Sequence, residues 1–181
     1  MNRFVLTLLL LVPIACGTSL AGERASPTDE AKLVQHDVDA IIRAIYRGDL
    51  DTVLEFTHPA IIQTLGGKSA ARAAMAQTAQ QIDRLEMKVE SLSFPAQPDF
   101  LEGGGRRFVI VPTFMILATK TQRLESRNFQ FGVLEPGSPR WTYIEGSRLT
   151  KDNVQKLFPG FPPNYEFPPC SRNVLGPKRA A

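Results

Sequence analysis

The sequence predicts a single α+β domain in which helices come first and an antiparallel sheet follows. Two observations carry this prediction. Apolar residues recur at helical spacing as far as Leu85, and from Met87 onward they follow the spacing of strands. Helices gathered before strands indicate an α+β arrangement rather than alternating β–α–β units. The 181 residues, 43% apolar and 22% charged, are typical of a folded globular protein.

Residues 1–21 have the features of a secretory signal peptide. Arg3 provides a positive start, residues 4–14 form an apolar run, and Ser19-Leu20-Ala21 has the small-x-small form that signal peptidase recognises. The run is shorter than the roughly 20 residues needed to span a bilayer. We therefore expect cleavage after Ala21 and a periplasmic or secreted protein.

A lipoprotein signal is the alternative interpretation of the same segment. Ile14-Ala15-Cys16-Gly17 resembles the motif in which the cysteine is lipidated, although Pro13 stands where that motif usually has leucine. A lipid on Cys16 would be the expected link to a membrane and would anchor the protein to the cell envelope. In both cases Cys170 is expected to be an unpaired thiol, with an intermolecular disulfide as the alternative.

The first predicted helix covers residues 28–47. Thr28 is expected to be its N-cap, with two acids following in the first turn, and Gly48 to end it. Its apolar residues are spaced for one helical face: Leu33, Val34, Val38, Ile41, Ile42 and Ile45.

Two further helices are predicted before residue 86. A shorter one covers residues 50–56 and is broken by His58-Pro59. After a turn through residues 61–65 and the pair Gly66-Gly67, a long helix carries apolar residues from Ala71 to Leu85.

Four strands are predicted, over residues 87–94, 107–119, 123–134 and 140–145. The second is apolar on both faces, which indicates a central strand covered on two sides. Pro112 lies within it and predicts a bulge or bend, because proline cannot donate to a ladder. Residues 95–105 end in three glycines and predict a loop.

The C-terminal part of the chain begins with Thr150, which is expected to cap a short last helix through Phe158. Residues 159–181 then form a tail in which six prolines alternate with aromatic residues. We predict an extended strap whose rings lie against the domain. A partner-binding strip and a disordered end are the alternatives. The expected organisation is a leader (1–21), one domain (22–158) and this tail.

The order of these elements resembles the NTF2-like superfamily. A long helix ending in Gly48-Asp49 is followed by a second helix, by Gly66-Gly67-Lys68-Ser69 opening a third, and then by long strands. The resemblance covers about residues 29–147. It implies a cystatin/NTF2-like cone, in which a curved sheet wraps around the helices and leaves an apolar pocket. Fold alone does not imply function in such a group.

The residues that ketosteroid isomerase uses within that superfamily are not matched. Its tyrosine on the first helix would fall near Ile41, and its aspartate base has no counterpart in residues 61–65. The resemblance therefore implies a pocket without implying that activity.

Motifs for cofactors, metals and nucleic acids are not found. Gly67-Lys68-Ser69 looks like the end of a phosphate-binding loop, but Ile62 stands where that motif requires glycine. Two histidines without a cysteine cluster do not make a zinc or copper site. The net charge of +3 is scattered, so no nucleic-acid partner is expected. We expect no cofactor and no metal.

A small set of polar and aromatic residues remains as candidates for a pocket. His58 follows the second helix and titrates near neutral pH, so it is the candidate general base, with Tyr143 or Glu145 as its partner. The other candidates for contact with a ligand lie on strands, and they are Asn128, Gln130 and Trp141.

Three functions agree with these candidates. The first is an exported, non-catalytic domain that binds a small apolar ligand, or an envelope partner, in or around its pocket. The second is a cofactor-free lyase, isomerase or hydrolase that uses His58 with Tyr143 or Glu145. The third is a structural or assembly protein that forms a homodimer.

Overall fold

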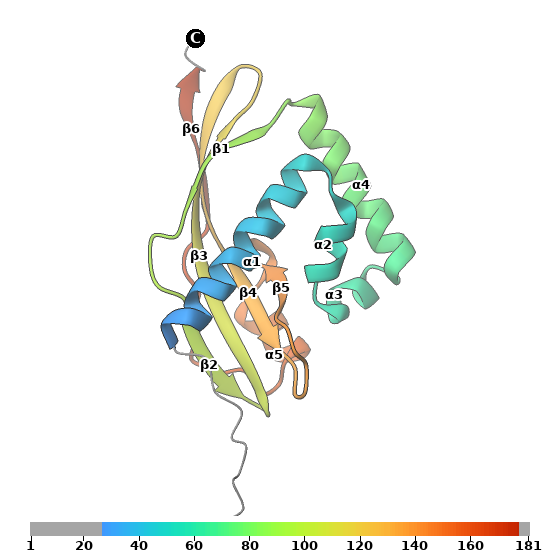
Figure 1. The fold of residues 1–181 in the computed structure, drawn as a ribbon, viewed down its shortest axis with the longest axis vertical. Coiled ribbons are helices and arrows are strands. Elements are labelled where there is room, and N and C mark those ends of the chain that lie inside the picture. The colour runs from blue at the N-terminus through green and yellow to red at the C-terminus, as the bar shows by residue number, and fades with distance from the viewer. Residues whose placement is uncertain (1–26, 178–181) are drawn as a thin grey trace, which may run out of the picture.

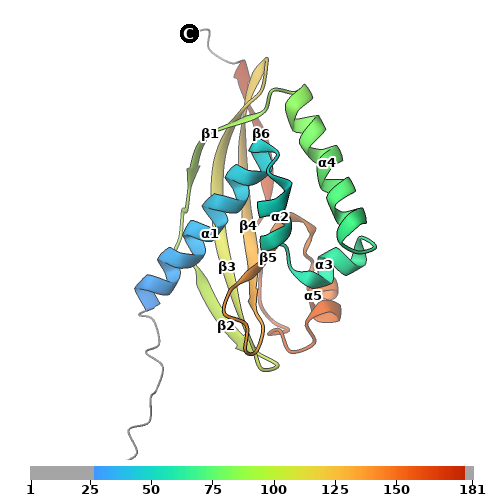
Figure 2. The same ribbon diagram turned by 45° about the vertical axis from the view of Figure 1, so that its right-hand side comes forward.

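The computed structural model describes residues 27–177. A group of helices is followed by a six-stranded antiparallel sheet, and Figures 1 and 2 show that the sheet is curved and that α1 lies along one of its faces. The predicted α+β class, with N-terminal helices against the concave face of a curved antiparallel sheet, is confirmed.

Four helices precede the sheet: α1 (Pro27–Arg47), α2 (Leu50–Phe56), α3 (Pro59–Thr64) and α4 (Lys68–Arg84). The junctions between them carry residues suited to end or begin a helix. Gly48 has a φ of 71°, the left-handed conformation that commonly ends a helix. The side chain of Asp49 accepts a hydrogen bond from the backbone N–H of Thr52 (3.2 Å) and caps α2. Nδ1 of His58 accepts from the N–H of Ala60 (3.1 Å) and caps α3.

The start of α1 differs from the prediction. The helix begins at Pro27, so Thr28 lies in the first turn and is not the N-cap. Proline suits the first helical position, because its fixed φ is already helical and its missing N–H would have no partner there.

The sheet contains six strands: β1 (Lys88–Ser93), β2 (Asp99–Gly103), β3 (Arg106–Ala118), β4 (Gln122–Leu134), β5 (Thr142–Glu145) and β6 (Ser171–Pro177). The two longest, β3 and β4, form its centre. β1 and β2 share the outer edge of β3, while β5 and β6 share the outer edge of β4. The central strand predicted for residues 107–119 is therefore paired on both sides.

The structure differs from the sequence analysis at two places in this region. Residues 99–103, expected in a loop, form β2, because Gly104 and Gly105 adopt positive φ values and turn the chain into a hairpin with β3. Pro112 causes no bulge, since the register with β4 is continuous across it. β1 ends opposite Phe114 and β2 starts opposite Ile110, so Pro112 lies where that edge of β3 has no partner strand.

The concave face of the sheet packs against α1. Val34, Val38 and Ile42 meet Val111, Leu117 and other strand residues in a cluster that also buries Trp141 and Tyr143. Arg107 on β3 donates two hydrogen bonds of 2.7 Å to Glu30 in the first turn of α1, which ties the start of the helix to the sheet.

The opposite face of the sheet is covered by the C-terminal part of the chain. After a 3-10 turn (Gly146–Arg148), α5 (Lys151–Leu157) begins at Thr150, which forms the predicted cap together with Asn153. Strand and tail aromatic residues then form one cluster, which includes Phe108, Phe129, Phe131, Phe158, Phe161, Tyr165 and Phe167. The tail thus lies along the domain with its rings against the sheet.

The end of this tail forms β6, a strand that the sequence analysis did not predict. Its side chains are mostly exposed, so no alternation of apolar and polar residues marks it. Within residues 27–177, no helix has the length and apolar character needed to cross a bilayer. The predicted leader (1–21), with Cys16, lies outside the described residues.

Candidate functional site

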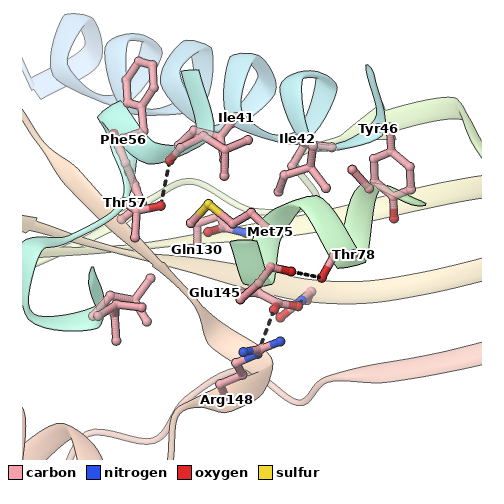
Figure 3. Close-up of a pocket in the computed structure, with 18 of the residues that line it drawn as sticks. Ile41, Ile42, Tyr46, Phe56, Thr57, Met75, Thr78, Gln130, Glu145 and Arg148 are labelled. Atoms are coloured by element: carbon pink, nitrogen blue, oxygen red, sulfur yellow. Dashed lines mark hydrogen bonds and ion pairs between the residues drawn. The ribbon is translucent and has the colours of Figure 1, made fainter. Parts of the chain in front are cut away.

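A pocket of about 520 Å³ lies between the helices and the concave face of the sheet. Figure 3 shows Ile41, Ile42 and Met75 pointing into it from the helical side. The helices supply most of its apolar lining: Ile41, Ile42, Ile45, Leu50, Val53, Phe56, Ile61, Met75, Ile82 and Leu85. The pocket therefore has a hydrocarbon wall contributed by α1, α2, α3 and α4.

The sheet side of the pocket is polar, and the strand register explains why. Thr113 is opposite Asn128, Gln130 is opposite Glu145, and Ser126 is opposite Arg172. Directly opposed residues, and alternate residues of one strand, share a face of a sheet. All six therefore lie on the concave face, and all except Ser126 line the pocket.

Two polar groups on the sheet side of the pocket have no partner among residues 27–177. Oγ1 of Thr113 is buried without a hydrogen bond, and the residue is only 2% exposed. Gln130 is 6% exposed, and its side-chain amide makes no hydrogen bond within residues 27–177. Buried polar groups are normally paired, so each such exception needs an explanation. Both groups face the pocket, where a bound molecule or water would supply the missing bond.

Glu145 and Asn128 form a bonded pair at one end of the pocket. Oε1 of Glu145 accepts from Nδ2 of Asn128 (3.0 Å) and from Oγ of Ser147 (2.8 Å), and Oε2 lies 3.6 Å from Nε of Arg148. Oδ1 of Asn128 accepts from the backbone N–H of Phe129 (2.8 Å). The carboxylate of Glu145 is thus held by three side chains of the protein.

Tyr46 and Arg172 approach the same end from α1 and β6. The phenol of Tyr46 is half-buried and forms no hydrogen bond among the described residues. Burial raises its pKa, while Arg172 lowers the pKa and Glu145 raises it, so both charges act on the phenol. Arg172 has no carboxylate within 4.0 Å in the part of the chain that the structure describes.

His58 does not line the pocket. Its Nδ1 caps α3, its ring packs edge-on against Phe158 at 5.1 Å, and its Nε2 lies 3.5 Å from Oε1 of Glu135. That distance is too long for a good hydrogen bond, and Nε2 has no other partner in the described part of the chain. Burial lowers the pKa of His58, and the carboxylate of Glu135 only partly opposes this.

Tyr143 and Trp141 are tied into the core. The hydroxyl of Tyr143 donates to Oδ2 of Asp37 (2.9 Å), and burial raises the pKa of both groups. Trp141 is buried beneath the guanidinium of Arg107, 5.6 Å from its ring centre, and does not line the pocket. The structure therefore brings Tyr143, Glu145, Asn128 and Gln130 to the pocket, and leaves His58 and Trp141 outside it.

The lining also includes Tyr46, Arg172 and Thr113, which were not among the candidates from the sequence. Arg172 lies on the strand that was not predicted. Thr113 could have been found, because it interrupts the apolar residues Val111 and Met115 on one face of the central strand.

No three histidine, cysteine or acidic side chains gather into a metal-binding group within residues 27–177. Cys170 is a free, exposed thiol whose Sγ lies 3.2 Å from Oδ1 of Asn128. Comparison of the chain with protein-family models, with curated proteins and with solved structures gave no match.

Proposed function

We propose that this protein is an exported NTF2-like domain that binds a small apolar molecule in the pocket between its helices and its sheet. The observation that carries the proposal is the pocket itself, about 520 Å³ in volume and walled by apolar side chains from four helices. Pockets that hold small molecules have volumes of roughly 300–1,000 Å³ and combine an apolar lining with a few polar groups.

A binding role agrees with the state of the polar side chains. The hydroxyl of Tyr143 is bonded to Asp37, and the carboxylate of Glu145 is bonded by its neighbours. His58, the candidate base, faces Glu135 outside the pocket. Binding by burial of apolar surface needs no proton transfer from any of these groups, and contributes about 25 cal/mol for each Å² removed from water.

The proposal is tested with a neutral apolar probe, N-phenyl-1-naphthylamine, whose fluorescence rises in apolar surroundings. Ala74 lines the pocket from α4, so Ala74→Phe should fill part of the space. Its neighbour Ala73 is exposed and does not line the pocket, so Ala73→Phe is a matched control. We expect saturable binding by the native protein and by Ala73→Phe, and weaker binding by Ala74→Phe.

Circular dichroism and thermal unfolding should first show that both variants are folded. Absence of saturable binding by the native protein would refute the proposal. Equal affinities of Ala74→Phe and Ala73→Phe would also refute it, because the probe would then bind somewhere else.

A further inference from the structure

Two arginines line the pocket, and only Arg148 faces a carboxylate of the described residues. This difference indicates what kind of apolar molecule binds there. We propose that the ligand is an apolar carboxylic acid whose carboxylate binds to Arg172. This inference rests on the proposed function, since it concerns the same pocket.

Arg172 is placed to receive an anion at the edge of the pocket. It lies on β6 opposite Ser126, so its side chain leaves the concave face of the sheet, and it is one of the residues that line the pocket. Arg148, the other arginine of the lining, already faces Glu145 at 3.6 Å, whereas Arg172 has no ion-pair partner within residues 27–177. The fork of a guanidinium matches a carboxylate with two parallel hydrogen bonds.

Tyr46 supplies a second donor to the lining of the pocket. Figure 3 shows its phenol reaching from α1 toward the sheet, and its charge environment includes both Arg172 and Glu145. The hydroxyl is free of hydrogen bonds to the described residues, and burial favours its neutral, donating form. A carboxylate beside Arg172 could therefore accept a further hydrogen bond from Tyr46.

Glu145 does not form an ion pair with Arg172. Its carboxylate instead contacts Asn128, Ser147 and Arg148. Two guanidinium groups and one carboxylate then stand at this end of the pocket, which favours an anion over a cation. The rest of an acid with a hydrocarbon body would lie along the apolar wall formed by the helices.

The experiment compares three probes that share a twelve-carbon chain: dodecanoate, 1-dodecanol and dodecyltrimethylammonium. Each is titrated at pH 7.5 to displace N-phenyl-1-naphthylamine from the full exported chain. We expect dodecanoate to bind about tenfold more tightly than dodecanol, as one charge-assisted contact would give. The cationic probe should bind more weakly than the alcohol.

Two variants assign the preference to Arg172. Arg172→Gln should weaken dodecanoate about tenfold and leave dodecanol unchanged, and the alcohol thereby reports that the pocket is intact. Arg84→Gln removes the same charge from an exposed position outside the pocket, and should leave both affinities unchanged.

The inference fails if acid and alcohol bind equally to the native protein, or if Arg172→Gln weakens both by the same factor. It also fails if the naphthylamine binds but none of the twelve-carbon probes displaces it. In these cases the pocket still binds an apolar probe. Failure of the naphthylamine itself to bind would instead overturn the proposed function.

Discussion

His58 is a buried imidazole whose surroundings favour its neutral form. It is 4% exposed, and the charged groups near it are the carboxylate of Glu135 and the guanidinium of Arg106, which bind each other at 2.8 Å. Burial lowers the pKa of His58 in the folded protein below its ordinary value of 6.5. The unfolded chain therefore takes up a proton at a higher pH than the folded chain does.

We expect the free energy of unfolding to fall as the pH drops below about 6.5, until the lowered pKa of folded His58 is passed. Asparagine caps helices well and does not titrate in this range. His58→Asn should therefore keep the cap of α3 and show a smaller decrease. Urea unfolding at pH 7.5, 6.5 and 5.5 measures both proteins, and parallel pH dependences would show that His58 is not the cause.

Thr113 illustrates how a binding pocket can reduce stability. Its hydroxyl is buried without a partner among the residues that the structure describes, and such a group costs about 1–3 kcal/mol. We expect Thr113→Val, which replaces the hydroxyl by a methyl group, to raise the free energy of unfolding of the unliganded protein by about 1 kcal/mol. Thr113→Ser, which keeps the hydroxyl, should not stabilise it. Urea unfolding of the two variants measures the difference, and a destabilised valine variant would show that the hydroxyl has a partner in solution.

Some individual residues of the pocket could be predicted from the sequence. Asn128, Gln130 and Glu145 were expected on strands, and the register places their side chains in the lining. His58 and Trp141 do not line the pocket, because a sequence does not show on which side of a turn, or at which edge of a sheet, a ring will lie. Arg172 reaches the pocket only because β6 pairs with β4, whose residues lie more than forty positions earlier in the chain. The sequence gives no local signal for that pairing.

Among the elements, the C-terminal tail covers one face of the sheet as a second layer. Phe161 is 2% exposed, and the centre of its ring lies 5.2 Å from that of Phe108 and 5.4 Å from that of Phe131. We expect Phe161→Ala to lower the free energy of unfolding by about 3–5 kcal/mol, as other deletions of buried phenylalanines do. Glu166→Ala, at an exposed position of the same tail, should change it by less than about 0.5 kcal/mol.

Chemical denaturation of these two variants compares buried and exposed positions of the tail directly. A small effect of Phe161→Ala would mean that the outer cluster contributes little to the stability of the folded protein. Equal losses in the two variants would point to an effect on the tail as a whole.

Most elements could be predicted because their signals are local. Helical spacing and glycine ends mark α1, and Thr150 marks α5. β2 and β6 were missed for two different reasons. β2 depends on the positive φ values of Gly104 and Gly105, and β6 is an exposed edge strand whose residues carry no alternating pattern.

For the whole molecule, the first prediction to test is that the leader is removed during export. We expect the mature protein to begin at Gly22, after removal of residues 1–21, and mass spectrometry of the protein from the envelope fraction will measure this. A mass that includes a lipid on Cys16 would favour the alternative signal. Retention of Met1–Ala21 would contradict both.

The closure of the outer aromatic cluster by residues 158–167 has a consequence for biogenesis. These residues leave the ribosome after Phe108, Phe129 and Phe131, so the three rings stay uncovered until residues 158–167 have also been made. A chain that is cut short or stalled before Phe158 would expose a broad aromatic surface to chaperones and proteases. Synthesis of residues 158–167 is therefore required before this face of the sheet can be covered as it is in the native state.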